Sequence, residues 1–353
     1  MTNRKIKILI ADDSLTVRNF LVKVFSLDPG IEVIGTAIDG QEAIEFVKKN
    51  RPDIITMDIN MPRLDGFEAT LKIMQENPIP IVIVSGDYNT TDTAKTFKAL
   101  ECGAVAILPR PVGVGNPDFD ETVHRFVSNV KLLSEVKVIR RWNRIYNSSV
   151  TQENPNTIKD ITQPIRIITL GASAGGPLVL QQILKNIPSN ISVPILIVQH
   201  LDVEFAQGYA DWLNIQSNIP IKIAKDGDIL TAGVAYMAPG NHHIGVKAYN
   251  TILVSKDSKE KGHRPSVAFM FRSVREVFRN QVLAIILSGM GDDGAEELKL
   301  LKDKGAITIA QDFDSSLIHG MPGEAIRIGA ASYILSPDQI IQFIKRNVSL
   351  SIK

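Results

Sequence analysis

Short apolar runs alternate with amphipathic segments through the first part of the chain. The continuous runs predict buried β-strands, and the segments between them place apolar residues at helical spacing, as with Leu21, Val24 and Phe25. The predicted strands are Lys5 to Ala11, Ile31 to Ala37, Asp53 to Asp58, Ile79 to Ser85 and Val105 to Leu108. The predicted helices are Ser14 to Leu27, Gln41 to Lys49, Gly66 to Gln75 and Thr91 to Leu100. Strict alternation of strand and helix predicts an α/β fold with a parallel sheet covered on both faces.

A change in pattern marks the boundary to a second domain. A segment with helical character from Glu121 to about Tyr146 runs into SSVTQENPNTIKDITQP, a polar stretch that predicts an interdomain linker. Beyond it, continuous apolar runs return at Ile165 to Leu170, Pro194 to Gln199 and Gln281 to Leu287. Such runs are typical of parallel strands buried on both faces. We therefore expect two doubly wound parallel-sheet domains, at residues 1–125 and 164–353, joined by a helix and polar linker at 126–163.

Composition narrows the class of protein. With 44% apolar and 22% charged residues, the 353-residue chain is neither disordered nor fibrous. Its 39 Lys and Arg nearly balance 38 Asp and Glu, so the charge gives no reason to expect a nucleic-acid partner. We expect no membrane insertion, because no apolar run approaches the roughly 20 residues that a spanning helix needs. A single cysteine, Cys102, fits a reducing compartment, and we expect a cytoplasmic protein.

Three aspartates stand at strand ends in the first domain. Asp12 and Asp13 close the first strand, and Asp58 closes the third. The carboxyl ends of parallel strands meet at one edge of the sheet, so these carboxylates are expected to cluster. A hard divalent cation such as Mg²⁺ relieves their repulsion, and Asp58 could then accept a phosphoryl group. The alternative is that the aspartates only cap the following helices.

The acidic pair, the D-x-x-M-P-x-x-D-G stretch from Asp58 to Gly66, and Ser85 together resemble the receiver domain of bacterial response regulators. The resemblance implies that Asp58 is the phosphoacceptor and that Asp13, Asp58 and the backbone carbonyl of Asn60 hold Mg²⁺. It also implies that Asp12 supports this site and that Ser85 contacts the phosphoryl group.

Two residues depart from the receiver pattern. Arg110 stands where receivers usually have Lys, and an arginine fork does not replace a compact ammonium group conservatively. Ile107 stands where they usually have an aromatic residue. These departures leave open whether phosphorylation still drives a switch.

The second domain places a serine, a histidine and an aspartate just after strands. Ser173 follows RIITL within GASAGGP, His200 ends PILIVQH, and Asp293 follows LAIILSGMGDDG. A serine hydroxyl needs an imidazole to take its proton, and that imidazole needs a carboxylate to fix its tautomer. Each residue alone has a simpler interpretation, as a helix cap or a hydrogen-bonded side chain. GASAG satisfies the G-x-S-x-G pattern, but the chain order Ser, His, Asp differs from that of common α/β-hydrolases. A dinucleotide-binding turn is disfavoured because Ser173 replaces the middle glycine of G-x-G-x-x-G.

These residues and their neighbours resemble the catalytic domain of the chemotaxis protein-glutamate methylesterases of the CheB type. The matching stretches are GASAGGP, QH at 199–200, APGNHH at 238–243, RPSV at 264–267, SGMGDDG at 288–294 and GMPGEAI at 320–326. The resemblance implies that Ser173 is the nucleophile, His200 the general base and Asp293 its partner, with oxyanion donors near Ala174 and Met290. The chain departs from the family pattern at Ala174, Leu201, Asp202 and Ala268.

The resemblance implies hydrolysis of glutamate γ-methyl esters, and deamidation of glutamines, on chemoreceptors. The expected partners are these receptors and a chemotaxis histidine kinase that phosphorylates Asp58. No cofactor is expected for the esterase chemistry, and the histidines lack zinc-site spacing. Two alternatives remain open: a non-enzymatic module that binds receptor or kinase, and a serine esterase of another pathway.

Overall fold

The computed structural model describes residues 4–86, 97–136, 138 and 164–348. The chain divides into two compact units, Met1–Ser148 and Ser149–Lys353. The predicted linker sequence from Ser148 to Pro164 lies almost entirely outside the described residues. The two units are therefore described separately.

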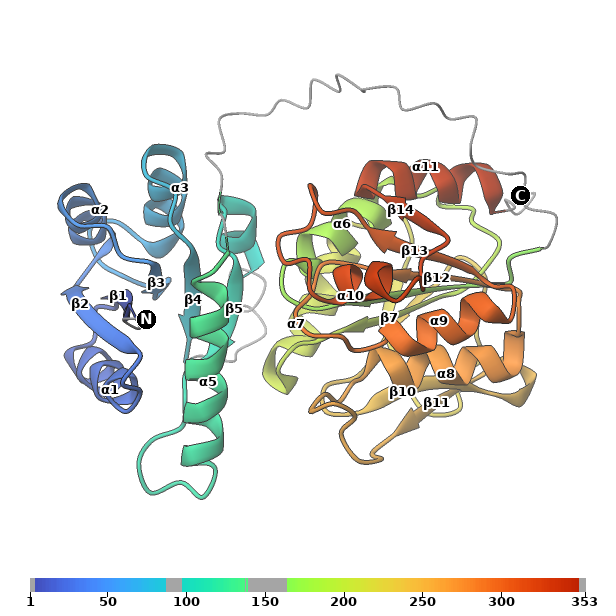
Figure 1. Ribbon diagram of the computed structural model, residues 1–353, viewed down its shortest axis with the longest axis horizontal. Helices are drawn as coiled ribbons and strands as arrows, with labels where there is room; N and C mark the ends of the chain where they lie inside the picture. Colours follow the sequence, from blue (N-terminus) through green and yellow to red (C-terminus); the bar gives the residue numbers. More distant parts are fainter. Residues whose placement is uncertain (1–3, 87–96, 137, 139–163, 349–353) are drawn as a thin grey trace. The chain divides into compact units, whose positions relative to one another are not determined.

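The first unit is built on a five-stranded parallel sheet with the order β2-β1-β3-β4-β5 (Figure 1). Its strands are β1 (Ile6–Ala11), β2 (Ile31–Ala37), β3 (Ile54–Met57), β4 (Ile81–Ser85) and β5 (Ala106–Pro109). Its helices are α1 (Leu15–Ser26), α2 (Gly40–Lys49), α3 (Gly66–Glu76) and α5 (Phe119–Leu133), and residues 97–102 are also helical. The chain order reverses between β1 and β3, so their carboxyl ends border the crevice where ligands of such sheets bind.

Helix α5 belongs to this first unit. It packs against α1 through two aromatic pairs, Phe20 with Phe119 and Phe25 with Phe126, whose ring centroids lie 6.5 and 5.5 Å apart. The domain boundary expected at residue 125 therefore falls inside a packed helix. The helix also begins before Glu121 and ends at Leu133, whereas the sequence pattern predicts a continuation to about Tyr146. Residues 139–146 lie outside the described part of the chain.

The second unit contains a seven-stranded parallel sheet with the order β14-β13-β12-β6-β7-β9-β8 and a separate antiparallel pair, β10-β11. The strands are β6 (Ile167–Ala172), β7 (Ile195–Gln199), β8 (Ile221–Ile223), β9 (Ala235–Met237), β10 (His243–Lys247), β11 (Thr251–Ser255), β12 (Val282–Ile286), β13 (Ile307–Gln311) and β14 (Tyr333–Leu335). The helices are α6 (Gly176–Asn186), α7 (Val203–Gln216), η2 (Ala248–Asn250), α8 (Val267–Phe278), α9 (Ala295–Asp303), α10 (Met321–Arg327) and α11 (Pro337–Asn347). Helices α6 and α11 pack together over one face of the sheet, and α8 and α9 over the other (Figure 1).

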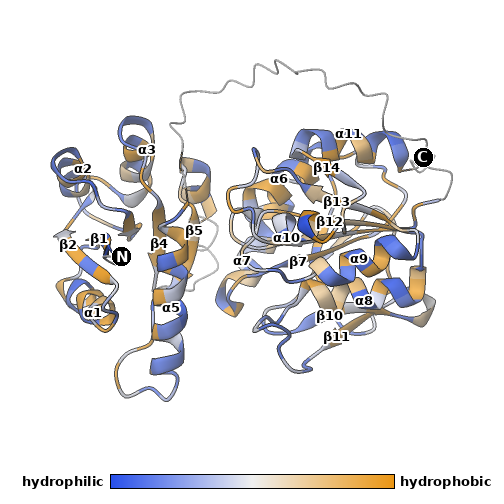
Figure 2. Cartoon of the chain, viewed as in Figure 1, coloured by the Kyte–Doolittle hydropathy of each residue, from blue (hydrophilic) through white to orange (hydrophobic). Residues whose placement is uncertain are grey.

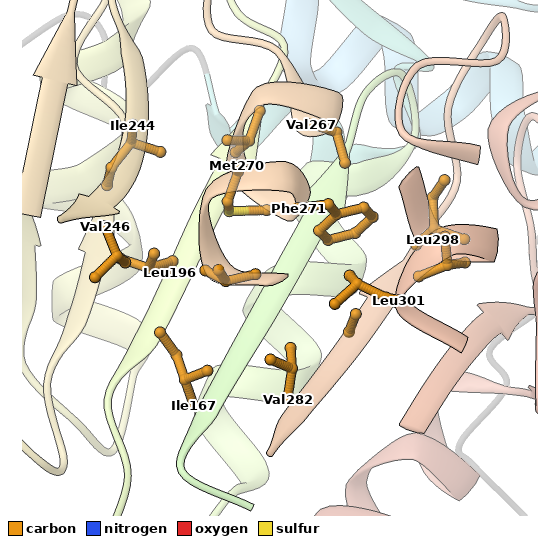
Figure 3. Packing of buried hydrophobic residues seen from close by; sticks show 14 of the residues in the cluster. Ile167, Leu196, Ile244, Val246, Val267, Met270, Phe271, Val282, Leu298 and Leu301 are labelled. Atoms are coloured by element: carbon orange, nitrogen blue, oxygen red, sulfur yellow. The ribbon is translucent and has the colours of Figure 1, made fainter. Parts of the chain in front are cut away.

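A buried core between α8 and the seven-stranded sheet holds this helix in place. Ile167, Leu196 and Val282 of the sheet belong to one buried cluster with Phe271 of α8 and Val246 of β10 (Figure 3). Burial of each such side chain stabilises the fold by about 1.5–3 kcal/mol. In Figure 2, α5 and α9 each carry both hydrophilic and hydrophobic residues, as helices at a protein surface do. Because α8 packs into this buried core, its start is fixed relative to the strand ends of the same sheet.

The predicted fold class, two parallel-sheet α/β domains, is confirmed. Six strands of the second unit were not predicted. Of these, β8, β9 and β14 have only three residues each, too few for periodicity to distinguish them from a loop, whereas β10, β11 and β13 have five. Among the described residues, no helix is both long and apolar enough to span a membrane.

Candidate active site and phosphorylation site

Ser173 and His200 leave two neighbouring strands side by side. Ala172 and Gln199 form the last residue pair of β6 and β7, so Ser173 and His200 are the next residues in register. The backbone N–H of His200 still donates to the carbonyl of Ala172 at 2.9 Å. Because paired strands run about 4.8 Å apart, the two residues lie next to each other at the carboxyl edge of the sheet.

The backbone of the Ser173 loop is held from several sides. Its N–H donates to the carbonyl of Ser288 at 3.0 Å, and Gln199 Nε2–H donates to its carbonyl at 2.9 Å. Gly175 then adopts φ 79°, and a Cβ at that position would lie 2.6 Å from Ser288 Oγ. Helix α6 begins at Gly176. The loop thus forms a sharp turn that only glycine completes without strain.

His200 and Asp293 form a buried pair. His200 Nε2 lies 2.8 Å from Asp293 Oδ2, and the two side chains are 8% and 1% exposed. The Asp293 carboxylate also accepts hydrogen bonds from Ser266 Oγ–H at 2.9 Å and from the backbone N–H groups of Val267 and Ala268 at 2.7 and 3.1 Å. The carboxylate therefore sits at the N-terminus of α8, where the helix dipole favours negative charge.

Opposing effects act on the pKa of Asp293. Burial raises it, but the hydrogen bond and charge of His200 and the N–H donors of Val267 and Ala268 outweigh burial and lower the pKa to about 2. The carboxylate is thus ionised at neutral pH. An ionised carboxylate accepts the Nε2–H of His200 and keeps the proton on that nitrogen.

The second ring nitrogen of His200 carries the lone pair. Nδ1 is buried and has no hydrogen-bond partner among the described residues. The Ser173 hydroxyl is adjacent through the strand register but is not hydrogen-bonded to the imidazole in this structure. The structure thus brings His200 and Asp293 into direct contact and places Ser173 beside them. Unliganded catalytic hydrogen bonds are often made only in the substrate complex.

The first unit gathers carboxylates where its central strands end. The backbone N–H of Asp58 donates to the carbonyl of Ala11 at 2.8 Å, so Asp58 stands beside the end of β1. Burial, and then the nearby charge of Asp12, raises the pKa of Asp58 to about 6. Asp12 is buried, and its Oδ1 accepts the N–H of Ser14 at 2.9 Å. Such crowded oxygen ligands suit a hard divalent cation.

The remaining predicted receiver residues lie at the ends of β4 and β5. Ser85 ends β4, and its carbonyl accepts the N–H of Arg110 at 3.0 Å. The Arg110 guanidinium lies over Gly86, since a Cβ at Gly86 would be 2.5 Å from Arg110 Nη2. Burial raises the pKa of Asp12, and the nearby charge of Arg110 partly opposes this rise. Ile107 is a buried residue of β5.

Comparison with known proteins matches each of the two units of the chain to a different protein family. Residues 168–344 match the family model for CheB methylesterase, and residues 8–116 match that for the response regulator receiver domain. The chain belongs to the CheB methylesterase family. It is 47% identical to a protein-glutamate methylesterase/protein-glutamine glutaminase of Nitrosospira multiformis, over 95% of both chains. A relative with the same activity in its name, from Geobacter metallireducens, is 48% identical over 95% of this chain and 97% of its own.

A solved structure resembles the second unit of this CheB-family chain. The methylesterase catalytic domain of Thermotoga maritima CheB matches with a TM-score of 0.50 and 33% identity, over 52% of this chain and 99% of that domain. The family membership predicted from the sequence motifs is thus confirmed.

Ser266 and His243 support the CheB-family site, although the sequence alone does not indicate either role. Ser266 caps α8 by accepting the N–H of Phe269 at 3.3 Å while its hydroxyl donates to Asp293. Nδ1 of the buried His243 accepts the N–H of Ser266 at 3.2 Å, and its Nε2 lies 3.1 Å from the carbonyl of Ser258. The one available signal was the serine of R-P-S-V just before an apolar helical pattern, which is typical of an N-cap. Ala268 contributes its backbone N–H, which any residue but proline supplies.

The predicted oxyanion donors are available in this CheB-family chain. Among the described residues, the backbone N–H groups of Ala174 and Met290 donate to no protein acceptor. Gly289 approaches Ser173 closely, since a Cβ on Gly289 would lie 2.8 Å from that of the serine. The segment that carries Met290 therefore lies against the turn at Ser173.

Metal ligation by side chains alone is not supported. No group of three or more His, Cys, Asp or Glu side chains in the described part of the chain is arranged to hold an ion. The predicted Mg²⁺ set differs from such a group, because it combines two carboxylates, Asp13 and Asp58, with the backbone carbonyl of Asn60. His242 and His319 make local contacts instead, with the carbonyl of Gly240 at 2.8 Å and the hydroxyl of Ser316 at 3.2 Å.

Proposed function

We propose that this chain is a phosphorylation-regulated serine hydrolase that demethylates glutamate γ-methyl esters, and deamidates glutamines, on chemoreceptors. The observation that carries the proposal is the buried His200–Asp293 pair beside Ser173 at one sheet edge. The names of the Nitrosospira and Geobacter relatives support the substrate class. Because the receptor bundle that carries these esters is cytoplasmic, the proposal places the enzyme in that compartment.

The tautomer of His200 sets the direction of proton transfer. Ser173 Oγ attacks the γ-carbonyl carbon of the ester while its proton passes to Nδ1 of His200, and Asp293 stabilises the resulting imidazolium through Nε2–H. The backbone N–H groups of Ala174 and Met290 stabilise the oxyanion. The C–O bond then breaks, and methanol leaves with the proton from Nδ1.

Water completes the reaction. It attacks the acyl-enzyme carbonyl as Nδ1 accepts one of its protons, and the bond to Ser173 Oγ breaks as that proton returns to the serine. The product is a glutamate side chain. With a glutamine substrate the same steps release ammonia in place of methanol.

In the receiver domain, Asp58 accepts a phosphoryl group from a histidine kinase. Asp13, Asp58 and the carbonyl of Asn60 would hold Mg²⁺, which supplies positive charge that offsets the phosphoryl oxygens. Ser85 and Arg110, from the ends of β4 and β5, contact the phosphoryl group. The esterase reaction itself uses only side chains and backbone groups of the second unit.

Methanol release from methylated receptor membranes tests the proposal. The parent is expected to release methanol, and Ser173→Ala is expected to release none above background. A phosphodonor is expected to accelerate the parent but not Asp58→Asn. Receptor binding without methanol release would instead make the chain a binding module. Turnover of simple esters without turnover of receptor would assign another substrate.

A further inference from the structure

A second imidazole lies flat against His200. The rings of His200 and His263 are stacked with centroids 3.9 Å apart and an interplanar angle of 5°. The His263 ring makes no hydrogen bond with the described residues, so the stack is its main directed contact. This contact covers a face of the ring that carries the unpartnered Nδ1.

His263 can stack on His200 in both charge states of the latter. Burial, followed by the proximity of His200, lowers the pKa of His263 to about 4. His263 is therefore uncharged at neutral pH. A neutral aromatic ring attracts a cation above its face, so the stack remains favourable when His200 becomes an imidazolium.

A tight hairpin holds His263 in place. Glu260 and His263 exchange backbone hydrogen bonds of 3.0 and 2.8 Å around Lys261 and Gly262. Both turn residues have positive φ, 48° and 84°, as in a two-residue hairpin turn. Lys261 Nζ forms an ion pair of 2.8 Å with Asp292, the residue before Asp293. Glu260 is paired with Arg272 of α8. The hairpin is thus tied to the same two segments that hold the Asp293 carboxylate.

His200 needs a contact of this kind. Its only side-chain hydrogen bond among the described residues is the one from Nε2 to Asp293. One hydrogen bond leaves the ring free to tilt about that contact, and a tilt would move Nδ1 away from Ser173. A flat neighbour against the ring face restricts the tilt without competing for Nδ1.

We propose that His263 is a positioning residue of the esterase site, whose ring fixes the plane of the His200 imidazole so that Nδ1 meets the Ser173 hydroxyl. The Lys261–Asp292 ion pair holds the hairpin that delivers this ring. The inference rests on the proposed function, because it assigns His200 as the base.

Three full-length variants test the role by steady-state methanol release. His263→Ala removes the ring and is expected to lower kcat by about 10- to 100-fold, with KM within about twofold of the parent, because misplacing a base slows chemistry more than binding. His263→Phe keeps a flat ring and is expected to retain most of kcat. His242→Ala, at a histidine of similar partial burial that contacts a loop carbonyl, is the matched control and is expected to leave kcat unchanged.

The His200 Nε2–H proton gives a readout that does not depend on turnover. In ¹⁵N-histidine-labelled protein its downfield resonance is expected to be sharp in the parent and in His263→Phe, and broadened by exchange in His263→Ala. Sharp resonances and parental kcat in His263→Ala would overturn the proposal, as would equal losses in the Phe and Ala variants. A parent without methanol release but with this pattern of resonances would defeat the proposed function, and would leave only the contact by which His263 holds the His200 ring in place.

Asp292→Asn gives an independent test if His263→Ala does not fold. It breaks the exposed ion pair with Lys261 and leaves both rings intact. A fall of a few fold in kcat at unchanged KM supports the positioning role. Parental kcat together with a sharp Nε2–H resonance in Asp292→Asn counts against it.

Discussion

The carboxylate of Asp293 binds Nε2 of His200, at 2.8 Å, and leaves Nδ1 without a partner among the described residues. In the proposed mechanism the serine proton therefore moves to Nδ1. Since this nitrogen faces no competing acceptor or donor, the site needs no rearrangement of the His200–Asp293 pair before reaction. Every role proposed for Ser173 depends on this tautomer.

Asp293→Asn tests the tautomer. The asparagine amide presents N–H donors as well as an oxygen, so it favours the wrong proton position on His200, and kcat is expected to fall by about 10³- to 10⁴-fold. The fold should persist, because the amide oxygen still accepts from the start of α8. Methanol release and the thermal unfolding midpoint measure the two effects. A loss below about tenfold, in a folded variant, would exclude the assigned role.

Ser266 links the stability of α8 to the site. Ser266→Ala removes the hydrogen bond to Asp293 and the cap on Phe269, so it is expected to lower the free energy of unfolding by about 1 kcal/mol. It is also expected to lower kcat, because the carboxylate loses one of its restraints. Ser336→Ala is the matched control, since Ser336 caps α11 through Gln339 and makes no contact with Asp293. Urea unfolding followed by Trp212 in a Trp142→Phe background compares the two. If both variants lower kcat alike, Ser266 has no specific link to the site.

The sequence predicts the sheet and the strand-end residues better than their supports. Ser173 and His200 could be placed together because parallel strands align their carboxyl ends at one edge. Asp293 could be added from its place after another apolar run. Ser266 and His263 could not, because their contacts with Asp293 and His200 depend on how loops remote in sequence fold back over the sheet. The end of α5 was misplaced for a related reason, since packing on α1 decides which part of an amphipathic segment belongs to the unit.

Gly86 and Arg110 form a pair that a single substitution would disrupt. A Cβ at Gly86 would lie 2.5 Å from the Arg110 guanidinium, so Gly86→Ala is expected to displace that side chain and slow phosphorylation of Asp58. The slimmer lysine needs less room, so Gly86→Ala with Arg110→Lys is expected to recover the rate. Phosphate-affinity electrophoresis after exposure to acetyl phosphate measures it. Equal rates in the parent and Gly86→Ala would show that the guanidinium takes no part in phosphoryl uptake.

Asp58 costs the first unit stability at neutral pH when no cation is bound. Burial, and then Asp12, raises its pKa in the folded state to about 6, above the value of about 3.9 for an unfolded chain. The contribution of Asp58 to the free energy of unfolding is fully present below about pH 4 and is lost as the pH rises through about 6. In EDTA at pH 7, Asp58→Asn is therefore expected to unfold at a higher temperature than the parent. Its free energy of unfolding is expected to be larger by an amount on the order of 2 kcal/mol.

The gain from Asp58→Asn should vanish near pH 4, where the parent carboxyl is protonated. Asp118→Asn is the control, because Asp118 is exposed and its side chain makes no capping hydrogen bond, so this change is expected to have little effect at either pH. Added Mg²⁺ should raise the unfolding temperature of the parent and much less that of Asp58→Asn, since the amide removes a charged ligand. An Asp58→Asn protein that is no more stable than the parent in EDTA at pH 7 would mean that neither burial nor the charge of Asp12 destabilises the ionised Asp58 carboxylate, and the electrostatic case for a cation at this site would fail.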